Sequence, residues 1–271
     1  MNLGEYNMQK KNAPIGVMDS GVGGLSVVTA LRQTLPYEDI LYFGDTANCP
    51  YGNKTREQLL KLSGNMLAYL TQRGVKCVAL ACNTTSSLAP VLRERVNVPI
   101  ITIAESAADT VTQAKLKRVG VIATVFTVGS GIYDRCIRVA SPDTTVASVG
   151  SPNLAALVEN AATTEAQFDA EIRACMDDLL ARAPVEDVIL GCTHYPLVLD
   201  RFRACFPALR FHDPAPQQAK RVLKYLTENA IANEPHRAKL TVFTTGDPDV
   251  FREKCEAYGY GETYDMEFLK V

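Results

Sequence analysis

The feature that most constrains this chain is a short apolar run that occurs twice and ends each time in a cysteine. Residues 188–191 read Val-Ile-Leu-Gly before Cys192, and residues 78–81 read Val-Ala-Leu-Ala before Cys82. Runs of this length, closed by glycine or small polar residues, favour buried strands of a parallel sheet over helices. Ligands of open α/β sheets bind beyond the carboxyl ends of the strands, so both thiols are predicted to lie at a binding cleft.

Strand and helix patterns alternate along the first half of the chain. The strand pattern 13–18 ends at a loop of glycines and small polar residues, 19–24, and a helical pattern follows over 25–35. A second strand pattern covers 40–45, and a helical pattern over 56–73 leads to the next strand. Three strand-helix units in succession predict a parallel, right-handed, doubly wound sheet. The glycine loop fits neither a dinucleotide motif nor a P-loop, so a small carboxylate suits it better than a nucleotide.

The same pattern restarts in the second half. Residues 118–124 echo residues 14–20, with Gly120 and Gly16 in matching places at an offset of 104 (120 minus 16). The two strand-end cysteines recur at a similar offset of 110 (192 minus 82). This self-similarity predicts an α/β fold of two similar doubly wound parallel-sheet domains, related by a pseudo-twofold axis, with the active site in the cleft between them.

The predicted domain division is discontinuous. One domain takes residues 1–104 together with 215–271, and the other takes 105–214. The C-terminal segment is assigned to the first domain because the second already has enough strands. Further helices are predicted over 88–96, 104–115, 154–161, 165–181, from beyond 192 to about 205, 217–229 and 249–258, and further strands over 99–103, 145–149, 209–212 and 240–245.

The composition is typical of a globular enzyme and excludes several other classes. Hydrophobic residues make up 47% of the 271 residues and charged residues 21%, and the formal net charge of −2 leaves no basic field for nucleic acid or an anionic membrane. The sequence has no apolar stretch of the ~18 residues that a membrane span needs, and its polar first residues lack the core of a signal peptide. We therefore expect a cytoplasmic protein with reduced thiols.

Most of the eight cysteines are predicted to be unreactive buried side chains. Cys77 and Cys82 are five residues apart, so along one strand they would point to opposite faces and could not share a metal ion. No Cys-x-x-Cys spacing occurs, and no metal site is expected. The cysteines assigned a packing role are Cys77, Cys136, Cys175, Cys205 and Cys255.

Cys82 and Cys192 differ from these because each ends a strand and precedes a predicted helix. Unpaired N–H groups and the helix dipole at such a position stabilise a thiolate and can lower the thiol pKa from ~8.5 toward neutrality. Each thiol could then act as a base. His194, two residues after Cys192, could assist or orient that thiol, and Asp19 could do the same for Cys82, although both residue types also serve as ordinary loop and capping groups.

Small polar side chains accompany both cysteines, and together they suit a small dicarboxylate. Two opposed thiols between matching halves suit a reaction whose substrate and product are mirror images, because one thiolate removes a proton from a carbon and the other thiol returns a proton to the opposite face. No cofactor motif is present, although a pyridoxal-binding lysine has no reliable local motif. The small polar residues are Ser20, Asn83, Thr84, Thr85, Thr124 and Thr193.

Six stretches carry a recognisable set of motifs. They are 19–25 (Asp-Ser-Gly-Val-Gly-Gly-Leu), 42–45 (Tyr-Phe-Gly-Asp), 50–52 (Pro-Tyr-Gly), 81–84 (Ala-Cys-Asn-Thr), 191–197 (Gly-Cys-Thr-His-Tyr-Pro-Leu) and 244–248 (Thr-Thr-Gly-Asp-Pro). Together they resemble bacterial glutamate racemases, within the aspartate/glutamate racemase family, over nearly the whole chain. Aspartate racemases typically carry Cys-Thr-Glu at the second cysteine, so His194 favours glutamate.

The resemblance implies a cofactor-independent, two-base isomerase that makes D-glutamate for peptidoglycan, with glutamate as its ligand and a homodimer as its assembly. It implies that Cys82 and Cys192 are the acid/base pair, assisted by Asp19, His194 and Glu159. The substrate-binding positions that it implies are Asp19, Ser20, Pro50, Tyr51, Gly52, Asn83, Thr84, Thr85, Thr124, Thr193 and His194.

Three alternatives remain open from the sequence. The first is a racemase for aspartate or a related amino acid. The second is a two-domain protein that closes on a dicarboxylate without chemistry, which would tolerate the loss of a thiol. The third is a thiol oxidoreductase, which no resolving-cysteine motif supports.

Overall fold

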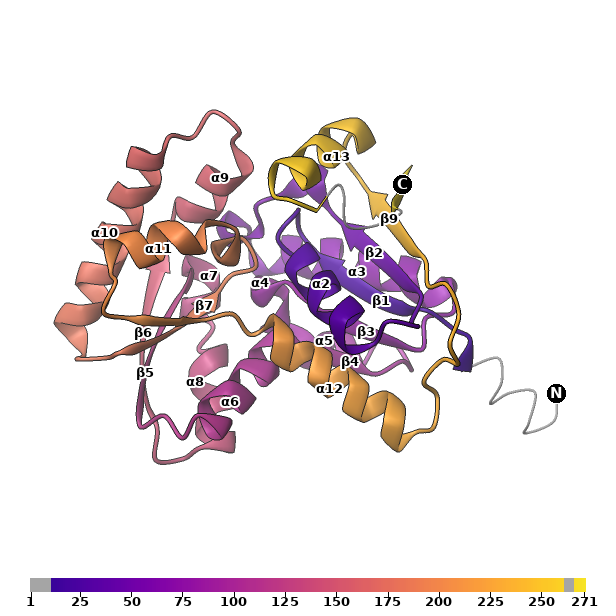
Figure 1. The fold of residues 1–271 in the computed structure, drawn as a ribbon, viewed down its shortest axis with the longest axis horizontal. Helices are drawn as coiled ribbons and strands as arrows, with labels where there is room; N and C mark the ends of the chain where they lie inside the picture. Colours follow the sequence, from indigo (N-terminus) through magenta and orange to yellow (C-terminus); the bar gives the residue numbers. More distant parts are fainter. Residues whose placement is uncertain (1–10, 261–265) are drawn as a thin grey trace.

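The computed structural model describes residues 11–260 and 266–271, and these form two parallel sheets that lie side by side (Figure 1). The strands are β1 (Ile15–Asp19), β2 (Ile40–Gly44), β3 (Cys77–Leu80), β4 (Ile100–Thr102), β5 (Arg118–Thr124), β6 (Thr145–Ser151), β7 (Asp187–Gly191), β8 (Arg210–His212), β9 (Leu240–Thr244) and β10 (Met266–Lys270). The first sheet has the order β10-β9-β2-β1-β3-β4 and the second the order β6-β5-β7-β8. Every pairing is parallel, which confirms the predicted fold class.

The two sheets repeat one strand order. In each, the first strand of the unit lies between the second and the third, with the fourth beyond the third. All five residues of β1 and all five of β7 are buried, because helices cover both faces of each sheet. This explains why both strands are continuous apolar runs and not alternating ones.

The helices form the outer layers of both sheets (Figure 1). Buried residues of α2 and α12 join one core cluster with β1 and β2, and those of α3 and α5 join another on the opposite face. Their bounds are α2 (Leu25–Thr34), α3 (Arg56–Gln72), α4 (Asn83–Ser86), α5 (Ala89–Arg93), α6 (Ile103–Gln113), α7 (Val125–Gly129), α8 (Ile132–Ala140), α9 (Leu154–Glu159), α10 (Glu165–Arg182), α11 (Leu199–Cys205), α12 (Ala215–Glu228) and α13 (Pro248–Ala257), with short 3-10 helices at η1 (Thr46–Asn48), η2 (Tyr51–Asn53) and η3 (Tyr195–Val198).

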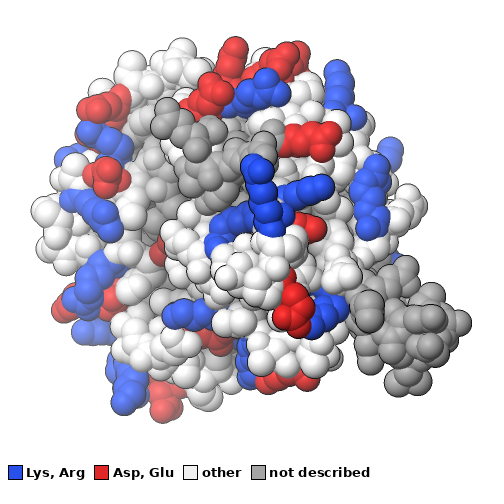
Figure 2. All heavy atoms as spheres, turned by 45° about the vertical axis from the view of Figure 1, so that its right-hand side comes forward, with Lys and Arg blue, Asp and Glu red and all other residues white. Residues whose placement is uncertain are grey.

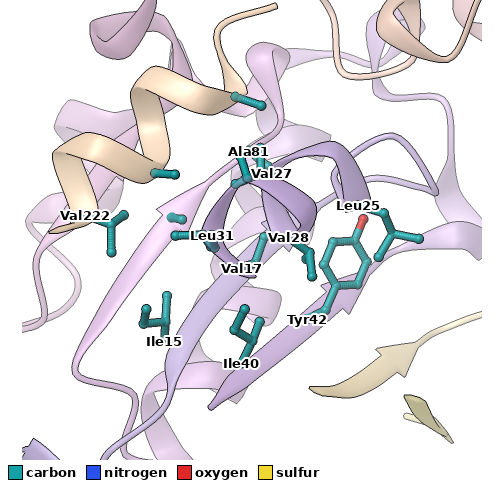
Figure 3. Close-up of a cluster of buried hydrophobic side chains, with 14 of the residues drawn as sticks. Ile15, Val17, Leu25, Val27, Val28, Leu31, Ile40, Tyr42, Ala81 and Val222 are labelled. Atoms are coloured by element: carbon teal, nitrogen blue, oxygen red, sulfur yellow. The ribbon is translucent and has the colours of Figure 1, made fainter. Parts of the chain in front are cut away.

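The C-terminal part of the chain returns to the first sheet. Val222 of α12 and Leu31 of α2 lie in the same cluster as Ile15 and Ile40 of the sheet (Figure 3). Strand β9 then pairs with β2 and carries β10 at the edge. The division of the chain into 1–104 with 215–271 and 105–214 stays a prediction.

Helices α7 and α8 and strand β10 were not predicted. Helices α7 and α8 occupy a stretch interrupted by Gly129 and Gly131, and α7 is only five residues long, too short for a helical period to be recognised. In α8, Tyr133 and Ile137 form a one-turn apolar stripe that buries against the second sheet. Strand β10 is an edge strand without a strong apolar pattern.

Charged side chains are mixed over the surface in view. On the face in Figure 2, basic and acidic groups lie next to one another, in keeping with 28 Lys and Arg against 30 Asp and Glu in the whole chain. None of the helices within 11–260 and 266–271 combines the length and the apolar character needed to cross a membrane.

Candidate active site

The two strand-end cysteines line one cavity between the two sheets. Cys82 follows β3, and its backbone N–H donates to the carbonyl of Met18 in β1, which fixes the end of the strand. Cys192 follows β7 directly. Their side chains lie in the wall of the same cavity although they come from different sheets. Topology therefore brings together two thiols that are 110 residues apart.

The cavity is small, and most of its lining residues carry polar side chains. Its volume is about 10 Å³, close to the space that one ordered water molecule requires. Of the predicted site residues, Asp19, Thr85 and Glu159 are not in its wall, and Ala155 is an addition that the sequence did not suggest. Its lining residues are Ser20, Pro50, Tyr51, Gly52, Cys82, Asn83, Thr84, Thr124, Ala155, Cys192, Thr193 and His194.

Cys82 is not acidified in this closed state. Burial first, and the charge of Asp19 second, raise the pKa of the Cys82 thiol to about 12. The expected fall toward neutrality is therefore wrong for this thiol. The helix that follows, α4, is a single turn of four residues and supplies too little dipole to offset the burial. Ser20 Oγ lies 4.0 Å from the sulfur, at the limit for a hydrogen bond.

Cys192 has a charged relay beside it. His194 Nδ1 lies 3.6 Å from Cys192 Sγ, and the other ring nitrogen, Nε2, lies 2.7 Å from Glu159 Oε1. Burial works against a charged imidazole, but hydrogen bonds with Cys192, Cys49 and Glu159 raise the pKa of His194 well above its ordinary value. The imidazole of His194 thus lies between a thiol and a carboxylate, where it can exchange a proton with the sulfur.

A lysine from the C-terminal helix extends this chain of contacts from Cys192 through His194 to Glu159. Lys254 Nζ in α13 donates to Glu159 Oε2 at 2.5 Å, and Tyr258 at the end of the same helix donates to the carbonyl of Val158 at 2.7 Å. Although burial opposes it, the hydrogen bonds and charges of His194 and Lys254 hold the pKa of Glu159 well below its ordinary value. His194 and the C-terminal helix together therefore favour the charged form of this carboxylate.

Asp19 supports the glycine loop and reaches across to the second half. Its Oδ1 accepts from the backbone N–H of Gly21, and its Oδ2 accepts from the Thr193 hydroxyl, both at 3.0 Å. Burial raises the pKa of Asp19, although His194 and these hydrogen bonds act in the opposite direction. Asp19 is placed to influence Cys82 through its charge, and it also positions the residue next to Cys192.

Asn83 offers an unsatisfied donor at the cavity. Its Oδ1 accepts from the Tyr133 hydroxyl, which fixes the orientation of the amide. Its Nδ2 is buried and has no hydrogen-bond partner within the described residues. A buried donor without a partner is costly unless a ligand satisfies it, so this amide is suited to bind a carboxylate.

Three threonine hydroxyls join the two halves at the cavity wall. Thr84 Oγ1 lies 3.1 Å from Thr124 Oγ1 and 3.3 Å from Thr127 Oγ1, and the latter two are 2.8 Å apart. Gly52 packs closely against the same cluster, because a Cβ there would lie 2.8 Å from Thr124 Cβ. Any side chain at position 52 would push the halves apart.

Two predicted binding side chains are engaged elsewhere. The Tyr51 hydroxyl donates to Asp45 Oδ2 and lies 3.3 Å from Met66 Sδ, so its phenol is anchored within the first half. The Thr85 hydroxyl donates to the carbonyl of Cys82 at 3.1 Å and caps the strand end. Tyr51 still lines the cavity, but Thr85 acts on the backbone beneath it.

Two further residues at the site were not predicted. Lys254 lies in the last predicted helix, 249–258, and nothing near it in the sequence signals a partner at Glu159. Cys49 lies between Asn48 and the Pro-Tyr-Gly motif, and its sulfur contacts both Glu159 Oε1 and His194 Nε2. Its position inside a motif loop was the one available signal. This trio is the only group in the described part of the chain whose atoms could jointly hold a metal ion.

Comparisons with known proteins identify the family of this chain. Residues 15–222 match the family model described as Asp/Glu/Hydantoin racemase. The glutamate racemase of Lactobacillus helveticus is 36% identical over 251 residues, which cover 89% of this chain and 91% of that protein. A glutamate racemase of Thermus thermophilus is 37% identical over 253 residues, covering 93% of this chain and 95% of that protein.

A solved structure agrees as well. The crystal structure of glutamate racemase from Francisella tularensis in complex with D-glutamate matches with a TM-score of 0.88 at 30% identity, over 96% of this chain and 98% of that one. These matches confirm the resemblance drawn from the motifs. The chain therefore belongs to the Asp/Glu/hydantoin racemase family, and within it to the glutamate racemases.

Proposed function

We propose that this protein interconverts L- and D-glutamate by moving a proton at the α-carbon between two thiols, without a cofactor. The observation that carries the proposal is that Cys82 and Cys192 line one cavity and come from different sheets. A carbon held between them exposes one face to each sulfur. One thiolate takes the α-proton, the charge is held on the carbon and its carboxylate, and the other thiol delivers its own proton to the opposite face.

The neighbouring groups support distinct roles for the two thiols. His194, paired with Glu159, is placed to give a proton to Cys192 or to take one from it. Asp19 acts on Cys82 by charge. For the substrate carboxylates, the free amide nitrogen of Asn83 is the leading donor, and the hydroxyls around it complete the set. The proposed substrate-binding residues are Asp19, Ser20, Pro50, Tyr51, Gly52, Asn83, Thr84, Thr85, Thr124, Thr193 and His194.

The small cavity implies that binding requires opening. A volume of about 10 Å³ accommodates about one water molecule, far less than an amino acid with two carboxylates. We therefore infer that the two halves separate to admit substrate and close around it, which excludes bulk water from the carbanion-like intermediate.

The family supports a wider role. We propose that the product D-glutamate serves peptidoglycan synthesis in the cytoplasm and that the enzyme is a homodimer. Rescue of a D-glutamate auxotroph by this chain tests the first proposal. Light scattering after size-exclusion chromatography tests the second, and a monomer at all concentrations would contradict it.

The direct test is polarimetry of L-glutamate with protein freed of metal and pyridoxal phosphate. We expect the optical rotation to decay to zero, and the double variant Cys82→Ala with Cys192→Ala serves as the matched control. A constant rotation with the unmodified protein would refute the proposed activity. Comparable kcat/KM values for glutamate and aspartate would move the proposal to a racemase of broader substrate range, and glutamate binding that survives in an inactive protein would indicate a non-catalytic binder.

A further inference from the structure

Three side chains with metal-binding atoms converge at the edge of the site. Cys49 lies in the loop between η1 and η2, Glu159 ends α9, and His194 follows β7. Cys49 Sγ lies 3.3 Å from Glu159 Oε1 and 3.8 Å from His194 Nε2, and these oxygen and nitrogen atoms are 2.7 Å apart. A thiol, an imidazole and a carboxylate are a ligand set typical of zinc.

The spacing of the three atoms is close to that around a tetrahedral ion. Zinc bonds of about 2.3 Å to sulfur and about 2.0–2.2 Å to nitrogen and oxygen place neighbouring ligand atoms roughly 3.3–3.6 Å apart. The two distances from Cys49 Sγ bracket this range. The distance between His194 Nε2 and Glu159 Oε1 is shorter, since a hydrogen bond now joins them, and has to widen by about half an ångström when an ion replaces the proton.

A glycine allows these atoms to approach the backbone closely. A Cβ on Gly21 would lie 2.3 Å from Glu159 Oε1, 2.8 Å from Cys49 Sγ and 3.2 Å from His194 Nε2. A side chain at position 21 would therefore collide with the ligand atoms, so the glycine is what lets the three side chains converge.

The outer contacts are arranged as they are around bound metals. Lys254 bonds Glu159 Oε2 and leaves Oε1 for an ion, and Cys192 contacts His194 Nδ1 and leaves Nε2. Partners on the far atoms of ligands hold them in orientation. The positive charge of Lys254 weakens binding of a cation, so we expect the site to be a reversible one. The partial exposure of Cys49 gives an ion a route of entry.

We propose that Cys49, Glu159 and His194 bind Zn²⁺ or a similar thiol-seeking divalent ion, with water as a fourth ligand, and that this binding inhibits the enzyme. On binding, the Cys49 thiol proton and the proton between His194 and Glu159 leave to solvent, and no group is oxidised or reduced. The ion binds His194 Nε2, the nitrogen that otherwise contacts Glu159. The binding is independent of the proposed racemase activity, whereas the inhibition depends on it.

Co²⁺ titration of chelator-stripped protein tests the binding. We expect a near-ultraviolet thiolate-to-Co²⁺ band with visible bands of tetrahedral intensity, all removed by one equivalent of Zn²⁺. Cys49→Ser should abolish the thiolate band. Cys136→Ser, which removes another half-buried thiol in α8, should leave it unchanged. A band that survives in Cys49→Ser but is lost in Cys192→Ser would assign the metal to the other side of His194 and overturn the proposal, as would the absence of any band.

A second variant tests the same site if Cys49→Ser fails to fold. Glu159→Gln keeps the size of the side chain and should weaken Co²⁺ binding by at least about tenfold, with the far-ultraviolet circular dichroism of the unmodified protein retained. Unchanged affinity in this variant would contradict the assigned ligand set. In activity assays, Zn²⁺ should inhibit the unmodified enzyme at concentrations at least about tenfold below those needed for Cys49→Ser. Metal binding in a protein that does not racemise glutamate would refute the proposed function and leave the metal site standing.

Discussion

The two halves of the molecule share one strand order but surround their thiols differently. Cys82 and Cys192 both follow the third strand of their unit and line the same cavity. Cys82 is buried, is close to the negative charge of Asp19 and makes a weak contact with the hydroxyl of Ser20. Beside Cys192 stands an imidazole backed by a carboxylate and a lysine, with His194 as the direct neighbour.

This difference shows that the repeated topology determines where the two thiols lie, whereas the local charges determine their protonation. A doubly wound unit delivers a thiol to the cleft in either half because the third strand always ends there. The Cys82 thiol is held in its protonated form by burial, with a pKa of about 12. The Cys192 thiol has the imidazole of His194 beside it, with Nδ1 3.6 Å from the sulfur. We therefore expect the two thiols to serve different steps, with Cys82 as the acid.

The largest expected effect comes from removing one thiol at a time. Cys82→Ala and Cys192→Ala should each lower racemisation by a factor on the order of 10² or more, the usual weight of a positioned acid or base. In deuterated water, Cys82→Ala should still exchange the α-hydrogen of L-glutamate with retention, and Cys192→Ala that of D-glutamate. Proton NMR of each enantiomer measures this.

The matched control for these variants is Cys136→Ala, which removes a half-buried thiol distant from the cavity lining and should retain full activity. If either single variant exchanged both enantiomers equally, the thiols could not be stereochemically opposed. The two-base mechanism would then be refuted.

Asp19→Asn should change the pH profile as well as the rate. In the unmodified enzyme we expect activity to rise as the base loses its proton and to fall only at strongly alkaline pH, because the acid Cys82 has a pKa of about 12. Removing the charge of Asp19 lowers that pKa, so the alkaline limb should move to lower pH, with a rate loss on the order of 10². Initial rates by circular dichroism measure both.

A rate independent of pH from about 5 to 10 in the unmodified enzyme would rule out a thiolate/thiol pair whose members start near ~8.5. An alkaline limb that stays in place in Asp19→Asn would show that Asp19 does not act on Cys82 by charge.

Lys254→Met should affect the Cys192 half specifically. The change removes a cation that helps to keep Glu159 charged and in place, so the pKa of Glu159 rises and its hold on His194 loosens. We expect kcat to drop about tenfold, equivalent to about 1.4 kcal/mol, with a smaller change in KM. Lys254→Arg should restore most of the activity.

Arg252→Met is the control on the same helix, because Arg252 pairs with Asp249 and lies over the Phe268 ring. Equal losses in the Lys254 and Arg252 variants would mean that helix α13 acts only through packing, and the relay would have no separate role.

The smallest effect concerns the contact that joins the halves. Thr127→Val removes a buried hydroxyl shared with Thr84 and Thr124 and should lower the free energy of unfolding by about 1 kcal/mol. Urea denaturation measures this loss, and Thr127→Ser, which keeps the hydroxyl, should retain most of the stability. Unchanged stability in Thr127→Val would show that the hydrogen bonds of this hydroxyl do not stabilise the contact between the halves.

Much of the fold could be predicted because its signals are local. The strand before Cys192, the helix that became α3 and the repeat at an offset near 104 are periodicities of neighbouring residues, which chain geometry turns into elements. Elements were missed where the period was too short to recognise, as in α7, or where the strand lay at an edge, as in β10.

The sequence by itself determined the fold class, the family and the two strand-end thiols, because apolar runs and motifs are written along the chain. Only the tertiary structure decided their surroundings. It placed Lys254 beside Glu159 across 95 residues and Cys49 beside His194 across 145 residues, and it turned the Tyr51 hydroxyl toward Asp45. It also reversed the expected acidity of Cys82. The physical reason is that protonation depends on burial and on charges through space, and neither is a property of sequence spacing.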